Sequence, residues 1–332
     1  MILLYILGEL MNVVYASDEN YIPYLGVSLY SLLKNNNHDF DEIFVYILDT
    51  GIELKSKEKL EKLCCEYDAK ISFLDVENIE SKIGLKIKSN MAISAYSRLF
   101  ISSLVNEDVE KILYLDSDSL VEGSFKHIWD CDIDDYYCAG VLDTTLPFYK
   151  KSVGLSENDD YINSGFLFIN LKKWRLDNVE EKFIDFITYY NGKVIHNDQG
   201  IINGTLHGKI LIINPCYNLL STFYEIPYDD VKKWYGLDDY YNKRIVENCV
   251  KYPIFVHFTN FIKGRPWFNN KKHPLYKEYK EYVLKSPFKD RVYITDDRSF
   301  KLKFFSFISN IFPLNIVSCF YKIYTKFFIK YF

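Results

Sequence analysis

Residues 111–121 read KILYLDSDSLV. The apolar half of this stretch predicts a buried strand, which ends in two aspartates that are one residue apart. Because residues i and i+2 of an extended chain project to the same side, Asp116 and Asp118 can reach one ion. Carboxylate oxygens suit Mg²⁺ or Mn²⁺, and such ions commonly hold a diphosphate. The alternative is a turn in which short polar side chains bond to their own backbone.

Around this stretch, apolar β-type runs alternate with segments of helix length, which is typical of a mostly parallel sheet covered by helices. Carboxylates at the carboxyl end of a central strand lie where such α/β sheets bind ligands. We expect one continuous α/β domain over residues 11–290. The expected strands are 12–16, 43–48, 71–76, 111–115, 138–142, 166–170, 210–213 and 254–257, and the expected helices are 24–34, 56–67, 91–104 and 179–190.

The composition indicates a folded protein and excludes several classes of function. A chain of 332 residues with 48% hydrophobic content is long enough to bury a substantial core. A formal net charge of −5 indicates no basic surface, so we expect no nucleic-acid partner. The seven cysteines are odd in number and form no C-x-x-C pair, which argues against a disulfide framework and a zinc site. We therefore expect a reducing, cytoplasmic environment.

Residues 1–10 include a short apolar stretch that lacks a basic flank and a cleavage site and is too short to span a bilayer. A strand pattern begins directly after Met11. We therefore expect residues 1–10 to be an upstream extension, with translation starting at Met11.

Residues 291–332 are expected to form a tail that associates with an anionic membrane surface. From residue 301 onward, eleven of 32 residues are Phe or Tyr, five are Lys and none is acidic, which leaves a charge of −10 for residues 1–300. Lys322, Lys326 and Lys330 recur every four residues and predict a cationic, amphipathic helix in the headgroup region. The alternatives are a helix packed on the domain and a membrane span over residues 304–321, which Asn310, Pro313 and Asn315 interrupt.

Five further motifs occur in a characteristic order and spacing. They are VVYASDENY (13–21), AYSRL (95–99), NSGFLFINLKKW (163–174), NDQGIIN (197–203) and HFT (257–259). In this order the chain resembles glycosyltransferase family eight, the retaining group that includes bacterial lipopolysaccharide galactosyl- and glucosyltransferases and glycogenin. The resemblance covers residues 11–270, and an ordered set is more specific than any single motif. It implies the GT-A fold, with a UDP-sugar as donor and Mn²⁺, or alternatively Mg²⁺, as cofactor.

The resemblance also implies roles for individual residues. The implied metal ligands are Asp116, Asp118 and His257, a set that suits Mn²⁺ better than Mg²⁺. The implied nucleotide-binding residues are Ala16, Asp18, Asn20, Tyr21, Arg98, Asp116, Ser117, Lys263, Gly264 and Arg265. The implied sugar-binding residues are Asp143, Asn163, Ser164, Asp198 and Gln199, and the last two are also the catalytic candidates.

Several of these residues have a purely structural alternative. Asp18 and Asn20 could cap a helix, Arg98 could form a surface salt bridge, His257 could be a core histidine, and Asp198 and Gln199 could begin a helix. The chain also departs from the family pattern after His257. This segment is two residues longer than in the family, and its glycine, Gly264, lies between Lys263 and Arg265. Either cation could therefore contact the diphosphate.

The resemblance implies transfer of galactose or glucose from a UDP-sugar to a hydroxyl of a glycan, with stabilisation of the leaving diphosphate. Retention could use a covalent intermediate on Asp198 or an attack on the same face, which the resemblance favours. With a membrane-bound tail, we expect a lipid-linked acceptor for lipopolysaccharide or another surface glycan, and a peripheral location at the inner face of the cytoplasmic membrane.

Two other classes of function remain as alternatives. A phosphatase of the haloacid dehalogenase type also carries D-x-D after a strand, but that motif normally begins the domain and continues to Thr or Val, where this chain has Leu120. The second alternative is a non-catalytic, membrane-associated module that only binds a sugar nucleotide.

Overall fold

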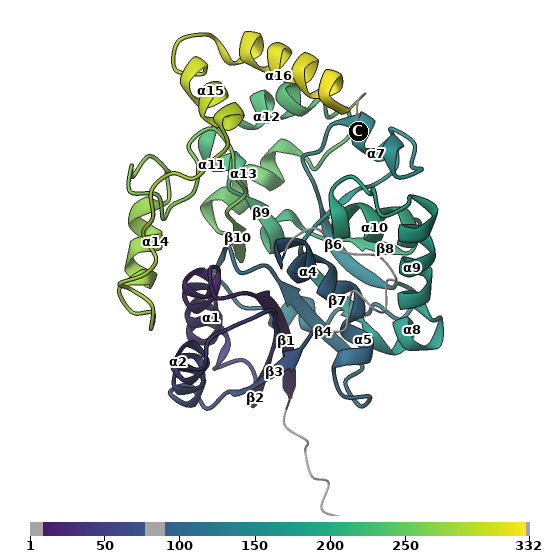
Figure 1. Cartoon of the computed structure of the whole chain (residues 1–332), viewed down its shortest axis with the longest axis vertical. Helices are drawn as coiled ribbons and strands as arrows, with labels where there is room; N and C mark the ends of the chain where they lie inside the picture. The colour runs from purple at the N-terminus through teal and green to yellow at the C-terminus, as the bar shows by residue number, and fades with distance from the viewer. Residues whose placement is uncertain (1–8, 77–89, 330–332) are drawn as a thin grey trace, which may run out of the picture.

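The computed structural model describes residues 9–76 and 90–329, so residues 1–8 of the expected extension and Lys330 lie outside it. A seven-stranded sheet with the order β3-β2-β1-β4-β7-β6-β8 forms its centre (Figure 1). All strands are parallel except β7, which pairs antiparallel with β4 and β6. The strands are β1 (Leu10–Ser17), β2 (Glu42–Asp49), β3 (Lys70–Asp75), β4 (Lys111–Leu115), β6 (Cys138–Leu142), β7 (Ile162–Asn170) and β8 (Ile210–Ile212). The expected mostly parallel α/β fold is confirmed.

Helices cover both faces of this sheet, and β1 shows why. Val13 and Tyr15 belong to the core beneath α1 (Ile22–Asn36) and α2 (Leu54–Cys65). Val14, between them, belongs to the core on the opposite face. Because successive side chains of a strand point to opposite faces, a strand buried on both sides is an almost continuous apolar run.

The opposite core contains apolar side chains from five helices, which are α4 (Asn90–Ser97), α5 (Ile101–Leu104), α8 (Leu171–Leu176), α9 (Val179–Tyr189) and α10 (Asn197–Leu206). The helix expected over 91–104 is not continuous, because the 3₁₀ turn η1 (Arg98–Phe100) separates α4 from α5. This turn carries Arg98 into the protein interior.

A second, three-stranded sheet lies beside the first. It has the order β5-β10-β9 and consists of β5 (Ser119–Val121), β10 (Phe255–His257) and β9 (Leu219–Leu220). The strand expected at 254–257 is β10, whereas β5 and β9 are too short to show a periodic pattern in the sequence. The pairing of β10 with β5 places His257 opposite Ser119, next to Asp118.

The remaining helical segments connect and cover these sheets. They are α6 (Lys126–Trp129), α7 (Pro147–Ser152), η2 (Pro215–Asn218), α11 (Thr222–Glu225), α12 (Tyr228–Tyr235), α13 (Lys243–Lys251), α14 (Tyr276–Val283), α15 (Phe300–Ile308) and α16 (Leu314–Ile329).

The C-terminal helices lie at one end of the molecule, shown in yellow in Figure 1, where α16 packs on α12 and α15 packs on α16. Phe305 and Val317 are buried in a third core, together with Trp234 of α12 and Phe261. Within residues 9–76 and 90–329, no helix combines the length and the apolar character that a membrane span requires. The structure therefore gives no support to a span over residues 304–321.

The expectation from the cysteine pattern is wrong at one point, because Cys216 and Cys249 form a disulfide. The two residues are 33 positions apart, and their Cα atoms are brought to 4.8 Å by the packing of α13 on η2. The spacing of cysteines along the sequence cannot predict this disulfide, because only tertiary packing brings its two cysteines together.

Candidate functional site

The site lies at the carboxyl ends of the parallel strands β1, β4 and β6 of the main sheet, where the antiparallel strand β7 begins. Asp116 directly follows β4, and its backbone N–H donates to the carbonyl oxygen of Gly165 in β7 (2.8 Å). The backbone N–H of Phe258 donates to the carbonyl oxygen of Asp118 (2.9 Å). These bonds fix the two aspartates between β7 and the segment after β10.

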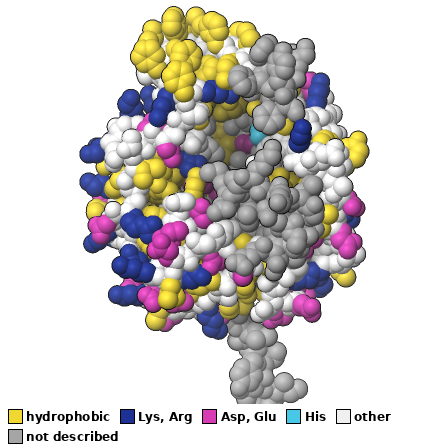
Figure 2. Space-filling view, viewed as in Figure 1, with side chains coloured by type: hydrophobic (Ala, Val, Ile, Leu, Met, Phe, Trp, Pro, Cys, Tyr) yellow, Lys and Arg dark blue, Asp and Glu magenta, His cyan; other side chains and the backbone are white. Residues whose placement is uncertain are grey.

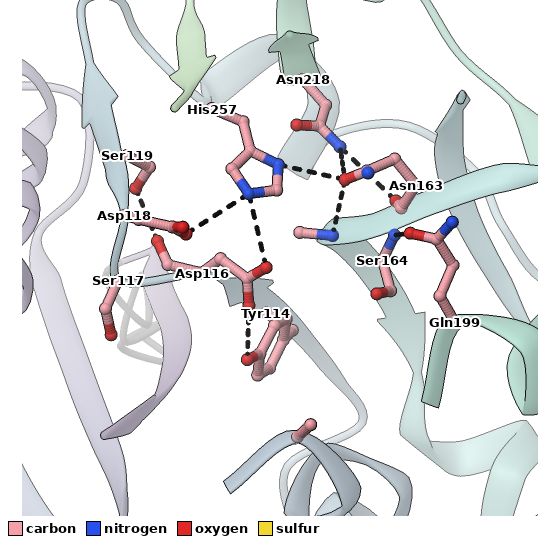
Figure 3. A network of polar contacts seen from close by, with 12 residues as sticks. Tyr114, Asp116, Ser117, Asp118, Ser119, Asn163, Ser164, Gln199, Asn218 and His257 are labelled. Atoms are coloured by element: carbon pink, nitrogen blue, oxygen red, sulfur yellow. Dashed lines mark hydrogen bonds and ion pairs between the residues drawn. The ribbon is translucent and has the colours of Figure 1, made fainter. Parts of the chain in front are cut away.

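Asp116, Asp118 and His257 converge as expected (Figure 3). The Nε2 atom of His257 lies 3.6 Å from Oδ2 of Asp116 and 3.3 Å from Oδ1 of Asp118. The three potential ligand atoms all lie within 4.8 Å of one another. Neighbouring ligands of an octahedral ion with bonds near 2.1 Å are about 3 Å apart, so this donor set fits a divalent cation.

The other oxygen of each carboxylate is held by a cation. Oδ1 of Asp116 accepts from Nη2 of Arg98 (2.9 Å) and from the hydroxyl of Tyr114 (2.8 Å). Oδ2 of Asp118 pairs with Nη2 of Arg265 (2.7 Å). Both aspartates are thus oriented so that one oxygen faces His257.

The charges of the cluster support one another. Burial raises the pKa of Asp118, but the charge of Arg265 and the hydrogen bond and charge of His257 outweigh it and hold this pKa below its usual range. Burial also opposes a charge on His257, whereas the hydrogen bond and charge of Asp118, with the charge of Asp116, raise the pKa of its imidazole. The Asp118 carboxylate is therefore ionised at neutral pH.

Arg98 is only 7% exposed and joins the cluster to the neighbouring helix. Its Nε pairs with Oδ2 of Asp198 (3.1 Å), and its Nη1 donates to the carbonyl oxygen of Ser164 (2.9 Å). Burial raises the pKa of Asp198, an effect that the positive charge of Arg98 opposes. The alternative of a surface salt bridge at Arg98 is wrong, because the ion pairs it makes are inside the protein.

Asp198 and Gln199 lie in the first turn of α10, so they begin a helix and also face the site. The Gln199 amide donates to Oδ2 of Asp143 (2.7 Å) and accepts from the backbone N–H of Ser164 (3.1 Å). The hydroxyl of Ser164 donates to Oδ2 of Asp198 (2.9 Å). A cavity of about 300 Å³ is lined by Arg98, Asp116, Asp143, Ser164, His196, Asp198 and Gln199.

Two residues of this region were missed by the sequence analysis. His196 lines the cavity, and its Nδ1 lies 3.1 Å from the hydroxyl of Tyr161. Its position directly before the NDQGIIN motif was the one available signal. Asn218, in η2, donates a hydrogen bond to the side-chain oxygen of Asn163 (3.0 Å). No recognisable sequence motif surrounds Asn218.

The segment expected to bind the nucleotide lies beside the aspartates. Oδ1 of Asp18 accepts from the backbone N–H of Tyr21 (2.9 Å) in the turn directly before α1. The hydroxyl of Ser117 donates to the carbonyl oxygen of Ala16 (3.0 Å). Asn20 donates to Oδ2 of Asp18 (3.4 Å) at the exposed rim.

The two candidate residues after His257 make different contacts. The guanidinium of Arg265 pairs with Asp118 and donates to the hydroxyl of Tyr21 (3.1 Å). The backbone N–H of Lys263 instead donates to the carboxylate of Glu225. Gly264 has a φ of +80°, and a Cβ there would lie 2.8 Å from the ring of Phe268, so the turn that aims Arg265 requires glycine.

Comparisons with known proteins agree with this site. The profile of glycosyl transferase family 8 matches residues 12–271. The chain is 30% identical to general stress protein A of Bacillus subtilis over 278 residues, which is 83% of this chain and 93% of that protein. It is 28% identical to lipopolysaccharide 1,2-glucosyltransferase of Escherichia coli K12 over 290 residues, or 85% of this chain and 80% of that protein.

Among solved structures, the chain is similar to the galactosyltransferase LgtC in complex with donor and acceptor sugar analogs. The TM-score is 0.68 and the identity 25%, and the match covers 83% of this chain and 96% of LgtC. This likeness agrees with the GT-A architecture expected from the motifs.

Proposed function

The chain belongs to glycosyl transferase family 8, and from this premise we propose that it moves galactose or glucose from UDP to a hydroxyl of a glycan with retained configuration. The family implies a nucleotide-sugar donor and a glycan acceptor. The phosphatase alternative finds no support, because the D-x-D segment lies in the middle of the family match rather than at its start.

The observation that carries this proposal is the convergence of two carboxylates and one imidazole beside a cavity lined by polar and charged side chains. Asp116, Asp118 and His257 would hold Mn²⁺, or alternatively Mg²⁺. When bound, the ion supplies positive charge for the diphosphate that leaves with the nucleotide. The full set of ligands also argues against a module that has lost its catalytic function.

The protein's own residues account for the rest of the chemistry. Arg265, beside Asp118 and Tyr21, is the cation that we assign to the diphosphate. The hydrogen bonds that link Asp143, Ser164 and Gln199 provide a polar lining that fits the hydroxyls of a hexose.

Asp198 bears on how configuration is retained. Its Oδ2 is held by both Arg98 and Ser164, and a carboxylate oxygen that accepts two such bonds is a weaker nucleophile. This arrangement favours attack on the same face of the sugar, with Asp198 and Gln199 positioning the donor.

The test measures UDP release from a panel of UDP-, GDP- and CMP-sugars in the presence of Mn²⁺ or EDTA. Wild type is compared with Asp118→Ala, and Asp132→Ala, an exposed aspartate after α6, is the matched control. We expect turnover of a UDP-hexose that is lost with EDTA and in Asp118→Ala but not in the control. Metal-independent turnover, or no turnover by a folded protein, would contradict the proposal.

The acceptor and the location are proposed from the C-terminal helices. Exposed apolar side chains gather on α15, α16 and the turn between them, and we call these residues the apolar cap: Phe304, Phe307, Ile311, Phe312, Ile316, Phe320 and Ile323. Figure 2 shows the cap at one end of the molecule, above a hollow that exposes acidic and histidine side chains. We propose that the cap rests on the inner face of the cytoplasmic membrane, near a lipid-linked glycan acceptor such as a lipopolysaccharide precursor.

The cap differs from the cationic stripe predicted by the lysine spacing. Nζ of Lys322 donates to the carbonyl oxygen of Lys233 (2.6 Å) in α12, and Nζ of Lys301 lies 4.6 Å from the centre of the Tyr324 ring. Both lysines therefore contact the protein. The surface that would meet the lipid is mainly apolar, so its binding depends more on buried area than on charge.

A further inference from the structure

A buried, hydrogen-bonded cluster, which we call the relay, lies beside Asp116 and Asp118 (Figure 3). It consists of Asn163, Asn218 and His257. We propose that Asn163 and Asn218 are positioning residues that hold His257 in the one neutral tautomer whose Nε2 can bind a metal. This inference rests on the proposed function for its metal site, although the tautomer itself can be measured without metal or nucleotide.

The direction of the hydrogen bonds follows from one backbone group. The N–H of Gly165, which can only donate, lies 3.0 Å from Oδ1 of Asn163. This contact identifies the atom as the oxygen of the amide rather than its nitrogen. Nδ1 of His257 lies 3.1 Å from the same oxygen. Because an oxygen only accepts, Nδ1 must carry the proton.

Asn218 makes this arrangement unambiguous. Its Nδ2 lies 3.0 Å from Oδ1 and 3.4 Å from the main-chain oxygen of Asn163, and the side chain is only 1% exposed. A flipped amide would place its oxygen against two other acceptors. Asn218 therefore donates, and it keeps the Asn163 oxygen turned toward His257.

The consequence lies on the other side of the ring. With the proton on Nδ1, a neutral imidazole has its lone pair on Nε2, which is the atom that faces Asp116 and Asp118. The ring also packs closely on β7, because a Cβ on Gly165 would lie 2.2 Å from Cε1 of His257. The relay and this close packing together fix both the tautomer and the orientation of the ligand.

This role for Asn163 differs from direct contact with the donor sugar. Asn163 is absent from the residues that line the cavity, whereas its neighbour Ser164 is among them. A sugar contact would affect donor binding and leave metal affinity without nucleotide unchanged. Groups that orient a metal-bound histidine typically change metal affinity by about 10- to 100-fold when they are replaced.

The test combines two measurements on the full chain. Nitrogen-15 NMR of the metal-free protein, with its imidazoles neutral, reports the tautomer of His257. Titration with Mn²⁺ alone, followed by electron paramagnetic resonance, reports metal affinity without nucleotide. The variants are Asn218→Asp, which replaces the donor by an acceptor, and Asn163→Leu, which removes the acceptor. Asn170→Ala, a buried asparagine at the other end of β7, is the control.

We expect the Nδ1–H form in wild type and a shift toward Nε2–H in Asn218→Asp. We also expect at least about tenfold weaker Mn²⁺ binding in both relay variants but not in the control. The added charge of Asn218→Asp would by itself strengthen cation binding, so a loss is specific to the relay. An Nε2–H ring in wild type, or wild-type Mn²⁺ affinity in both variants, would overturn the proposal. Absent turnover with an intact tautomer and metal affinity would count against the proposed function alone.

Discussion

At the scale of single residues, the site depends on which atom of each side chain is already held. Arg98 and Arg265 each take one oxygen of an aspartate and leave the other toward His257. Charge-assisted bonds of this kind define geometry as well as energy. The same two arginines therefore serve both the fold and the chemistry of the site.

The choice between the two cations after His257 can be tested directly. We expect Arg265→Met to weaken UDP binding in the presence of Mn²⁺ by about tenfold or more, because a charge-assisted hydrogen bond contributes about 1.5–3 kcal/mol. Lys263→Met is the matched variant and should bind UDP nearly as wild type does. Isothermal titration calorimetry measures both, and a larger loss in Lys263→Met would reverse the assignment.

At the scale of elements, short segments determine where the loop that carries Arg265 lies. The carboxylate of Glu225, at the end of α11, accepts from the backbone N–H of Lys263. From the other side, the guanidinium of Arg298 donates to the carbonyl oxygens of Phe261 and Ile262 (both 2.8 Å). The loop that carries Arg265 is thus held by two segments that are far apart in the sequence.

Glu225 makes stability depend on pH. Burial raises the pKa of its carboxyl to about 8 from an ordinary value of 4.5, against the opposing hydrogen bond from Lys263 and the charge of Arg298. Its folded pKa lies above its unfolded one, so its contribution is fully present below pH 4.5 and is lost as pH rises toward 8.

We therefore expect Glu225→Gln to reduce the fall in the free energy of unfolding between pH 4.5 and about 8. Urea unfolding followed across this range measures the effect. Glu281→Gln, an exposed glutamate of α14, is the control and should keep the wild-type pH dependence. An unchanged pH dependence in Glu225→Gln would contradict the expectation.

At the scale of the whole molecule, the C-terminal helices are part of the folded unit. The hydroxyl of Ser306 in α15 donates to the carbonyl oxygen of Ile262 (2.6 Å), and Phe305 is buried in the same core as Trp234, where its ring packs on Tyr321. Removal of residues 301–332 would disturb the loop before Arg265 as well as the apolar cap. Surface substitutions therefore test membrane binding more cleanly than a truncation does.

We expect the combined change of Phe304, Phe307 and Phe320 to Ser to weaken binding to anionic vesicles by at least about tenfold, because exposed aromatic area drives insertion. Vesicle co-sedimentation at low and high salt measures this, and high salt should weaken wild-type binding only modestly.

Three apolar residues elsewhere that are more exposed than these phenylalanines, changed together to Ser, provide the control: Leu54, Leu176 and Tyr189. UDP-hexose hydrolysis without membranes should remain in both triple variants. Equal vesicle binding by wild type and the cap variant would contradict the membrane proposal.

The fold class, the family and most of the residues that converge at the carboxyl end of the sheet follow from the sequence alone. Strands β1, β2 and β4 could be predicted because a strand covered on both faces must be apolar along most of its length, and this is a local property. The aspartates after β4 were recognisable because a strand end and two nearby carboxylates are adjacent in the chain.

The partners that these residues contact become visible only in the folded chain. The pairing of β10 with β5 brings His257 to Asp118, and η2 brings Asn218 to Asn163. It also joins Cys216 to Cys249, pairs Arg265 with Asp118, and places the ammonium of Lys322 on α12. The physical reason is that strands of two or three residues and single buried polar contacts carry no periodic signal, so their partners are selected by packing across the folded chain.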